Sequence, residues 1–404
     1  MKYWAGEIIG ELATPITGLA IPIIAISLLG AGPIEMGFLG AMRTLPFLTF
    51  GLLAGVLVDR ARRVRVLILS SVISALLLAM IPASVALGVL GMPILYAEAF
   101  LNGTMGVIFA VASQSLIPTL AGRDRLIEAN RNIQMTTSAA EIVGPGIAGF
   151  LIQALTAPIA IVVDALSYLA SAGFLLWMRV SEPLRRRDER PHVVAEVREG
   201  LAIVLGDRYL RWITLCGTTH NFFSNGILVS LYVLFATQRL GLTPVELGLV
   251  FAAGGPGSLL GGLLVSRVVR LLGLGPAIGL MQALTGIARM AMPLALAVGA
   301  PVVVLGAGEF VLGLARTVFN VNQLSLRQAI TPDHQQGRMN ASIRFLMWAI
   351  VPFGALLGGW MGESVGMEIT VLIGAAGTLA ASLWILLGPV RFLRERPEAT
   401  GLAG

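Results

Sequence analysis

A short segment of this chain occurs twice, and the two copies lie half a chain length apart. Gly55-Val-Leu-Val-Asp59-Arg60-Ala-Arg62-Arg63 returns as Gly262-Leu-Leu-Val-Ser266-Arg267-Val-Val-Arg270, and each copy lies between two long apolar stretches. Other matches keep nearly the same offset, namely Glu98 with Glu309, Gln114 with Gln323, and Asn130 with Asn340. This repeat indicates that one membrane unit was duplicated in parallel, an arrangement typical of secondary transporters with two similar halves.

The composition places most of the chain in a lipid bilayer. Its 404 residues are 56% hydrophobic and 12% charged, whereas soluble domains carry roughly twice that charged fraction. A membrane-spanning helix needs about 20 mostly apolar residues. Twelve such runs lie near residues 4–29, 35–58, 66–89, 93–118, 129–154, 157–178, 210–236, 245–266, 275–297, 301–326, 339–362 and 367–390.

These runs predict an all-α membrane protein with twelve transmembrane helices in two six-helix bundles. We expect the N-terminal bundle at 1–179 and the C-terminal bundle, with a short cytoplasmic tail, at 209–404. Residues 180–208 form a charged linker, in which apolar residues at helical spacing from Val193 to Val204 predict a short amphipathic helix on the inner membrane face. A solvated tether is the alternative.

The arginines are distributed asymmetrically. The net charge of +6 is high enough to suggest nucleic-acid binding, but the arginines crowd into alternate loops and the linker, while the opposite loops hold only Arg239. This pattern follows the positive-inside rule, predicts that both termini are cytoplasmic, and argues against nucleic acid as a partner. The first apolar run lacks a signal-peptide cleavage site, so we expect it to remain as a membrane helix. The single cysteine, Cys216, excludes an intrachain disulfide.

The first copy of the repeated segment resembles the best-known motif of the major facilitator superfamily, which lies between that superfamily's second and third helices. The resemblance rests on Gly55, Asp59, Arg60 and Arg63; the superfamily usually has glycine at the position of Arg62. The second copy keeps Gly262, Arg267 and Arg270 but replaces the acid with Ser266. The resemblance implies that the first copy latches the inner ends of the two halves in the outward-open state. A plain positive-inside cluster is the alternative.

Residues Glu141-Ile-Val-Gly144-Pro145-Gly146-Ile-Ala-Gly149 resemble the glycine–proline motif that marks antiporters within this superfamily. Small residues permit close helix packing, and Pro145 removes one backbone hydrogen bond and permits a bend. The resemblance implies antiport through Gly144, Pro145 and Gly149, whereas helix packing alone is the simpler explanation of the glycines.

Other segments resemble the branch of the superfamily that contains macrolide efflux carriers and enterobactin exporters. They are Leu126-Ile-Glu-Ala-Asn130, Val163-Asp164-Ala-Leu-Ser167-Tyr168, Glu196-Val-Arg-Glu-Gly200-Leu and Gly337-Arg338. This resemblance implies proton-coupled efflux of an amphipathic small molecule such as a drug, macrolide or siderophore. The chain departs from the branch at Thr14, where an acid is common; Glu11 lies three residues earlier.

Ionisable residues inside the apolar runs are candidates for proton coupling, because a charge at mid-bilayer costs at least a few kcal/mol and needs a partner, a proton or water. Glu141 is the first candidate, since it shares a polar stripe with Gln134 and Ser138 and directly precedes the Gly144-Pro145 bend. A permanent salt bridge or a neutral hydrogen bond is the alternative role. The further candidates are Glu11, Glu98, Asp164 and Glu309.

A second polar stripe consists of residues spaced three, four or seven positions apart, which places them on one face of a helix. Its members are Glu309, Arg316, Asn320, Gln323 and Arg327. Glu309 and Arg316 are expected either to pair with each other or to pair with other helices. Arg43 and Arg289 are expected to neutralise buried acids or to attract an anionic cargo. The residues expected to line a substrate cavity are Arg43, Gln134, His220, Asn221, Arg316 and Asn320.

The sequence therefore predicts a proton-driven, monomeric exporter of the bacterial inner membrane that works by alternating access. No metal site, nucleophile or phosphate-binding loop is recognisable, so we expect neither a cofactor nor enzymatic activity, with the proton gradient as the driving force. The expected partners are a small-molecule substrate and the lipid bilayer. An importer or uncoupled facilitator of the same fold is the main alternative, and a membrane enzyme or sensor a more distant one.

Overall fold

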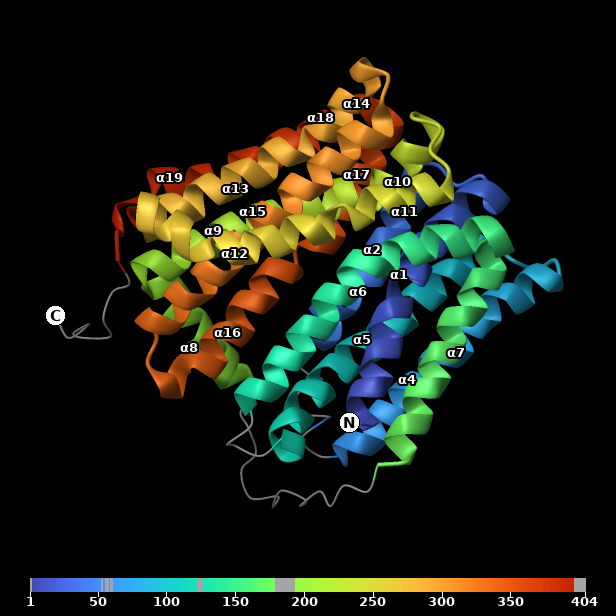
Figure 1. The fold of residues 1–404 in the computed structure, drawn as a ribbon, viewed down its shortest axis with the longest axis horizontal. Coiled ribbons are helices and arrows are strands. Elements are labelled where there is room, and N and C mark those ends of the chain that lie inside the picture. The colour runs from blue at the N-terminus through green and yellow to red at the C-terminus, as the bar shows by residue number, and fades with distance from the viewer. Residues whose placement is uncertain are drawn as a thin grey trace. The chain divides into compact units, whose positions relative to one another are not determined.

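A computed structural model describes residues 2–51, 54, 58, 61–121, 126–178 and 193–395 (Figure 1). The described residues are helical apart from short connections, and they contain no strand. The chain divides into two compact units, one comprising Met1–Arg190 with Tyr232–Ala252 and the other Pro191–Leu231 with Ala253–Gly404. The short segment Tyr232–Ala252 thus belongs to the first unit although it follows the start of the second half in the sequence.

The first unit is a bundle of long helices that are joined by tight turns. Its helices are α1 (Lys2–Leu29), α2 (Pro33–Phe50), α4 (Arg63–Ala86), α5 (Met92–Ala121), α6 (Leu126–Leu155), α7 (Ala157–Leu176), most of α10 (Val229–Gln238) and α11 (Pro244–Ala252). Glu35 and Glu246 each accept a hydrogen bond from the backbone N–H three residues earlier, at Gly32 and Thr243. These bonds satisfy donors that a helix leaves unpaired at its N-terminus.

The second unit contains interrupted helices and a π-helical segment. Its elements are α8 (Val193–Gly206), α9 (Arg208–His220), the π-helix η2 (Asn221–Leu228), α12 (Gly254–Leu272), α13 (Leu274–Arg289), α14 (Ala291–Val298), α15 (Pro301–Ile330), α16 (Asp333–Trp348), α17 (Val351–Ser364), α18 (Met367–Ala380), α19 (Leu383–Leu387) and the 3₁₀ turn η3 (Pro389–Phe392). The chain therefore runs from α9 through the π-helix η2 directly into α10.

Both units repeat one packing pattern. In the first unit α1 packs on α6 and α7, α4 on α5 and α7, and α2 on α5; in the second, η2 packs on α17 and α18, α13 on α15 and α18, and α12 on α15. Glycines mark equivalent crossings. A Cβ added to Gly103 would lie 2.7 Å from the carbonyl oxygen of Arg43, and one added to Gly313 would meet the carbonyl oxygen of Gly254. The duplication that the sequence suggests is thus present in the packing.

Ten helices within the described residues are long and apolar enough to cross a membrane. The segments 35–58 and 210–236, which we also expect to span, are not among them. The first includes residues outside those described, and the second carries His220, Asn221 and Asn225, which lower its hydropathy.

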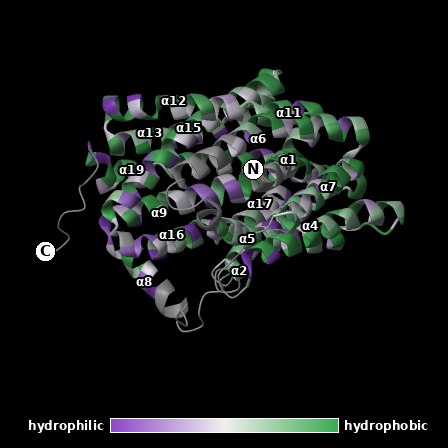
Figure 2. Cartoon of the chain, turned by 60° about the horizontal axis from the view of Figure 1, so that its bottom comes forward, coloured by the Kyte–Doolittle hydropathy of each residue, from purple (hydrophilic) through white to green (hydrophobic). Residues whose placement is uncertain are grey.

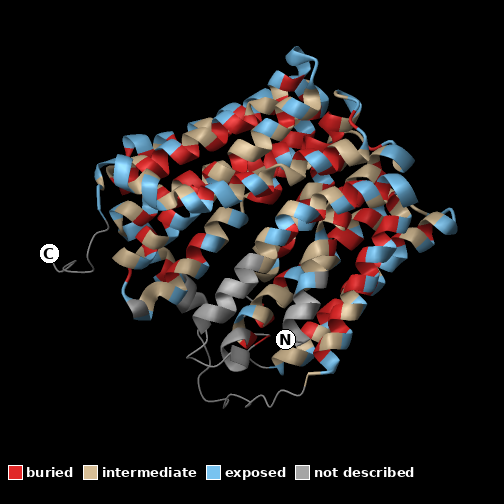
Figure 3. Cartoon of the chain, viewed as in Figure 1, coloured by how far each residue is buried: buried red, intermediate tan, exposed pale blue. Residues whose placement is uncertain are grey.

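Hydrophobic residues, green in Figure 2, occur along the length of the helices. Many large ones are exposed, among them Phe150, Leu176, Leu263, Leu271 and Val303. Such surface is stable in lipid and not in water. The buried residues lie along the lines where helices pack within each unit (Figure 3).

Candidate functional site: buried ionisable groups in two helical units

The first copy of the repeated motif falls largely outside the described residues, which exclude Gly55, Asp59 and Arg60. Arg63 is described: it begins α4, and its Nη1 donates a hydrogen bond of 2.9 Å to the backbone carbonyl of Ser115 on α5. This bond ties two neighbouring helices of the first unit together at one end. The latch role of the motif remains a prediction.

The second copy lies on α12, and its three matching residues Gly262, Arg267 and Arg270 are all exposed. A Cβ at Gly262 would meet nothing within 4 Å. The described contacts therefore give Gly262 no packing role within its own unit.

The glycine–proline motif packs α6 against two helices. A Cβ on Gly144 would lie 2.8 Å from the ring of Pro15 in α1, and a Cβ on Gly149 would lie 3.0 Å from the Cα of Gly248 in α11. Pro145 takes part in the second crossing, because a Cβ on Gly248 would lie 2.5 Å from its carbonyl oxygen. The simple packing explanation of these glycines therefore has direct support.

Two carboxyl groups are fully buried in the first unit. Glu98 on α5 has an exposed fraction of 0% and Asp164 on α7 one of 1%. Asn102 donates to Glu98 Oε1 at 3.0 Å, while Glu98 Oε2 has no hydrogen-bond partner among the described residues. Asp164 accepts hydrogen bonds from the hydroxyls of Thr17 on α1 and, at 3.1 Å, Ser167.

Further ionisable groups surround this carboxyl pair. Glu98 and Asp164 are close enough for their charges to interact, and Arg43 of α2 acts on Glu98 with the opposite sign. The hydroxyl of Tyr168 lies in the field of both carboxyls and of Glu11, and it contacts the hydroxyl of Thr14. Electrostatic interactions thus link acids on α1, α5 and α7 with Arg43 on α2 and Tyr168 on α7.

Glu141 has a different environment. Glu141 lies on α6 and is exposed. The apolar residues Val143, Ile147 and Phe150 of the same helix are also exposed, and they form a stripe suited to lipid. At 3.6 residues per turn, Glu141 lies roughly 160° around the helix from Val143, so it faces away from that stripe. Gln134 also belongs to α6, but its side chain lies outside the described residues.

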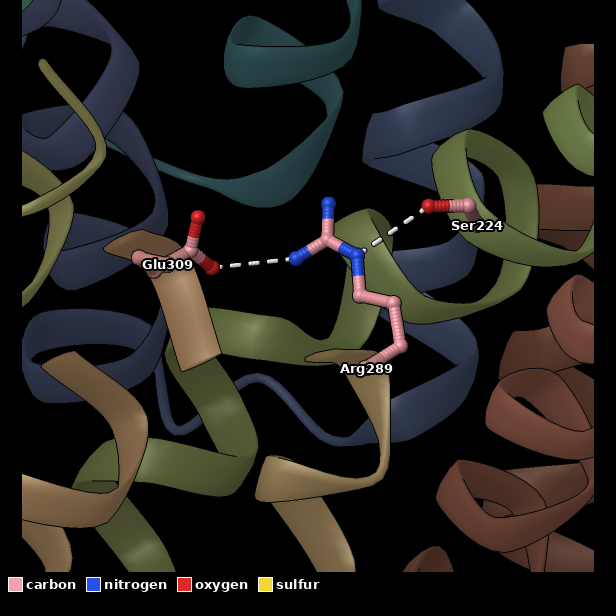
Figure 4. Close-up of polar contacts among 3 residues, drawn as sticks. All are labelled: Ser224, Arg289 and Glu309. Atoms are coloured by element: carbon pink, nitrogen blue, oxygen red, sulfur yellow. Dashed lines mark hydrogen bonds and ion pairs between the residues drawn. The ribbon is translucent and has the colours of Figure 1, made fainter. Parts of the chain in front are cut away.

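In the second unit, the acid equivalent to Glu98 forms an ion pair. Glu309 Oε1 on α15 accepts a hydrogen bond of 3.0 Å from Arg289 Nη1 on α13, and both side chains are about nine-tenths buried (Figure 4). Arg289 Nε also donates to Ser224 Oγ on η2 at 3.1 Å. Of the two arrangements expected for Glu309, the structure shows pairing with another helix, and Arg289 has the neutralising role.

The π-helical segment joins this ion pair to a set of neutral polar contacts. Asn221 Nδ2 donates to the carbonyl of Met347 at 2.7 Å, and Asn225 Nδ2 donates to Asn221 Oδ1 at 2.6 Å. His220 Nδ1 lies 3.1 Å from Gln282 Nε2 on α13. These hydrogen bonds hold His220 and Asn221 within the second unit, and their contact with cargo remains a prediction.

The polar stripe on α15 lies within an arc of roughly 60° when the helix is drawn at 3.6 residues per turn. Its environment changes along the helix: Glu309 is about nine-tenths buried in its ion pair, Arg316 and Asn320 are exposed, and Gln323 and Arg327 are buried. The exposed middle of the stripe is the part that a solute could reach. Arg316 and Asn320 therefore remain candidates for cargo contact.

Sequence reasoning missed several partners of these groups, notably Thr17, Asn102, Ser224 and Gln282. Asn102 follows Glu98 by four residues, and that spacing alone could have indicated the bond. The other three come from distant helices, so no local signal identifies them. Among the described residues, no group of three His, Cys, Asp or Glu side chains could hold a metal ion.

Comparison with known proteins places this architecture in a family. The sequence profile of the transmembrane secretion effector family matches residues 1–399. The multidrug efflux pump Tap of Mycolicibacterium fortuitum is 29% identical over 96% of this chain and 93% of its own length. Macrolide efflux protein A of Streptococcus pyogenes is 23% identical over 97% of this chain and 96% of its own length.

Solved structures share the fold at low sequence identity. The nucleoside transporter NupG matches with a TM-score of 0.73 and 13% identity over 96% of this chain and 99% of its own. A D-xylose-proton symporter matches with a TM-score of 0.72 and 14% identity, over 99% of this chain and 97% of its own. These likenesses establish the fold, and the profile establishes the family: the chain is a multi-pass membrane protein that belongs to the transmembrane secretion effector family of major facilitator transporters.

Proposed function

We propose that this protein exports an amphipathic small molecule, such as a drug, macrolide or siderophore, in exchange for protons that enter the cell. The near full-length similarity to a multidrug efflux pump and a macrolide efflux protein supports the cargo class. In this proposal it is a secondary transporter of the bacterial inner membrane with both termini in the cytoplasm, works as a monomer, needs no cofactor and catalyses no covalent chemistry.

One observation carries the proton-coupled part of the proposal: Glu98 is fully buried and one of its oxygens has no hydrogen-bond partner in the part of the chain that the structure describes. A buried carboxylate whose oxygen lacks a donor is strongly disfavoured, whereas a carboxylic acid tolerates the same site. Asp164 is also buried and lies within electrostatic range of Glu98, and two carboxyls that interact hold one proton between them more readily than they hold two negative charges. We therefore assign the coupled proton to the Glu98–Asp164 pair.

This assignment differs from the sequence-based preference for Glu141. That residue is exposed, so it needs no proton to remain stable, and its position opposite the lipid-facing stripe suits contact with water or cargo. In the proposal Glu141 is the accessible acid of α6, and it serves as the comparison residue for Glu98 and Asp164.

Proton entry supplies the driving force. Moving one elementary charge through the membrane potential releases about 2.3 kcal/mol per 100 mV. Alternating access lets the carboxyl pair take a proton from outside and release it inside, while cargo moves in the opposite direction. The motif residues Gly55, Asp59, Arg60 and Arg63 are proposed to latch the inner ends of the halves during this cycle.

The direct test uses everted membrane vesicles that contain the protein in their membrane. A radiolabelled macrolide is added to the solution outside the vesicles. An acidic lumen should drive accumulation of the macrolide, and a protonophore should abolish it. Accumulation that the protonophore does not affect would identify another driving ion, and equilibration without accumulation would identify a facilitator. If no macrolide accumulates, a panel of dyes and siderophores in the same vesicles distinguishes a different cargo from a protein that exports nothing.

A further inference from the structure

The structure brings together two of the segments that resemble the macrolide-efflux branch. Glu199 and Gly200 lie on α8, and Arg338 lies near the start of α16. Helix α8 packs along α16 in the second unit, as Figure 1 also shows. The linker helix is therefore docked on a membrane helix rather than free.

The docked face consists of one ion pair, one glycine and an apolar cluster. Arg338 Nη1 forms a salt bridge with Glu199 Oε1. A Cβ on Gly200 would lie 2.7 Å from the carbonyl oxygen of Arg338 and would collide with Ser342 Oγ. Val204 is completely buried, against Met339 and Ile343 of α16. Only glycine at position 200 lets the two helix backbones approach this closely.

These contacts have separate roles. The side chains of the ion pair are 40% and 48% exposed, and exposed pairs contribute little to stability. Burial of Val204, Met339 and Ile343 supplies the attraction between the helices. The pair and the glycine instead fix the position of α8 along α16, because charge placement and a close backbone approach both select one register.

Helix α8 also leads directly into the helix that contains the π segment. Asp207 caps α9 by accepting hydrogen bonds of 2.8 Å from the backbone N–H groups of Tyr209 and Leu210. Further along, Asn221 holds the carbonyl of Met347 near the end of α16. Helices α9 and α16 are thus joined at both ends, by α8 at one and by Asn221 at the other.

We propose that α8 is a positioning element of the transport cycle, in which Glu199, Gly200 and Arg338 keep α9 and α16 moving as one piece. The inference rests on the proposed export function for its transport readout. It assigns these residues no contact with cargo or proton. Loss of the docking contacts should consequently slow the conformational step and leave the cargo concentration for half-maximal rate unchanged.

The test compares Glu199→Arg, Arg338→Glu, the double charge swap, Gly200→Ala and the matched control Gly206→Ala. A Cβ on Gly206 meets nothing within 4 Å, and both glycines lie in α8, so the two alanine variants share the same gain in helix propensity. We expect lower maximal transport rates for both single charge reversals and for Gly200→Ala, with unchanged KM. The charge swap should recover most of the rate, and Gly206→Ala should match the wild type. Wild-type rates in all single variants, or a swap that recovers nothing, would overturn the proposal.

A second measurement separates this inference from the proposed function. Spin labels at the exposed positions Leu205 on α8 and His334 on α16 report the docking without any cargo. We expect one narrow distance distribution that broadens in Gly200→Ala and not in Gly206→Ala. The same broad distribution in the wild type would refute the docking. A narrow distribution in a protein that exports nothing would refute only the export function.

Discussion

Gly149 of α6 and Gly248 of α11 pack backbone against backbone: a Cβ added to either glycine would lie 3.0 Å from the Cα of the other. The added Cβ would also meet a carbonyl oxygen on the opposite helix, that of Pro244 or of Pro145. A carbonyl in a helix cannot move aside as a flexible side chain can. The glycine–proline motif of α6 is therefore a contact surface for two helices as well as a site of flexibility.

Gly149→Ala should destabilise the protein by about 1–3 kcal/mol, since overpacking a close contact forces backbone shifts. Gly146→Ala is the matched control in the same helix, because a Cβ there meets nothing within 4 Å. Thermal unfolding in detergent should show a lower Tm for Gly149→Ala alone. Equal Tm values for the two variants would show that α6 and α11 do not pack this closely.

Removal of one partner of the Arg289–Glu309 pair should be costly. Arg289→Met leaves the Glu309 carboxylate nine-tenths buried without its cation, and breaking a buried pair in this way costs about 3–5 kcal/mol. The double variant Arg289→Met, Glu309→Met removes both charges and should be more stable than Arg289→Met alone. Thermal unfolding of the two single variants and the double variant forms the cycle; additive losses would show that the two residues do not interact.

Asn221→Ala should leave the carbonyl of Met347 unpaired within the second unit. Asn221 is buried and its amide is the donor to that carbonyl, so the loss should be about 1–3 kcal/mol. Asn225→Ala removes only the bond between the two asparagines and should have a smaller effect. Hydrogen exchange of α16 is the more specific measurement: faster exchange near Met347 is expected in Asn221→Ala, and unchanged exchange would contradict the capping role.

Several features of the fold follow from the sequence because they are periodic or repeated. Apolar runs of spanning length located the helices, and the common offset of pairs such as Glu98 with Glu309 indicated a duplicated unit, which the structure shows as equivalent crossings at Gly103 and Gly313. The π-helix at Asn221–Leu228 was not anticipated, and neither was the close approach of its Gly226 to Gly354 of a distant helix. Local sequence carries no signal for such tertiary packing.

The environment of each acid was also beyond the sequence. Glu98, Glu141 and Glu309 all lie within apolar helices. Glu98 is buried with one oxygen that no described residue hydrogen-bonds, Glu141 is exposed, and Glu309 is paired with arginine. Helical spacing groups residues onto a face but does not say whether that face meets lipid, water or another helix. The partner Arg289 lies twenty residues before Glu309 on a different helix, outside the reach of helical spacing.

The most direct test of the account compares Glu98→Gln, Asp164→Asn and Glu141→Gln in two vesicle assays with a transported macrolide. One assay measures accumulation driven by an imposed pH gradient, and the other measures exchange of labelled for unlabelled macrolide without a gradient. Because glutamine and asparagine mimic the protonated acids and cannot release a proton, Glu98→Gln and Asp164→Asn should retain exchange and lose gradient-driven accumulation. Glu141→Gln should retain gradient-driven accumulation. Full gradient-driven accumulation in both Glu98→Gln and Asp164→Asn would contradict the assignment of the coupled proton to this buried pair.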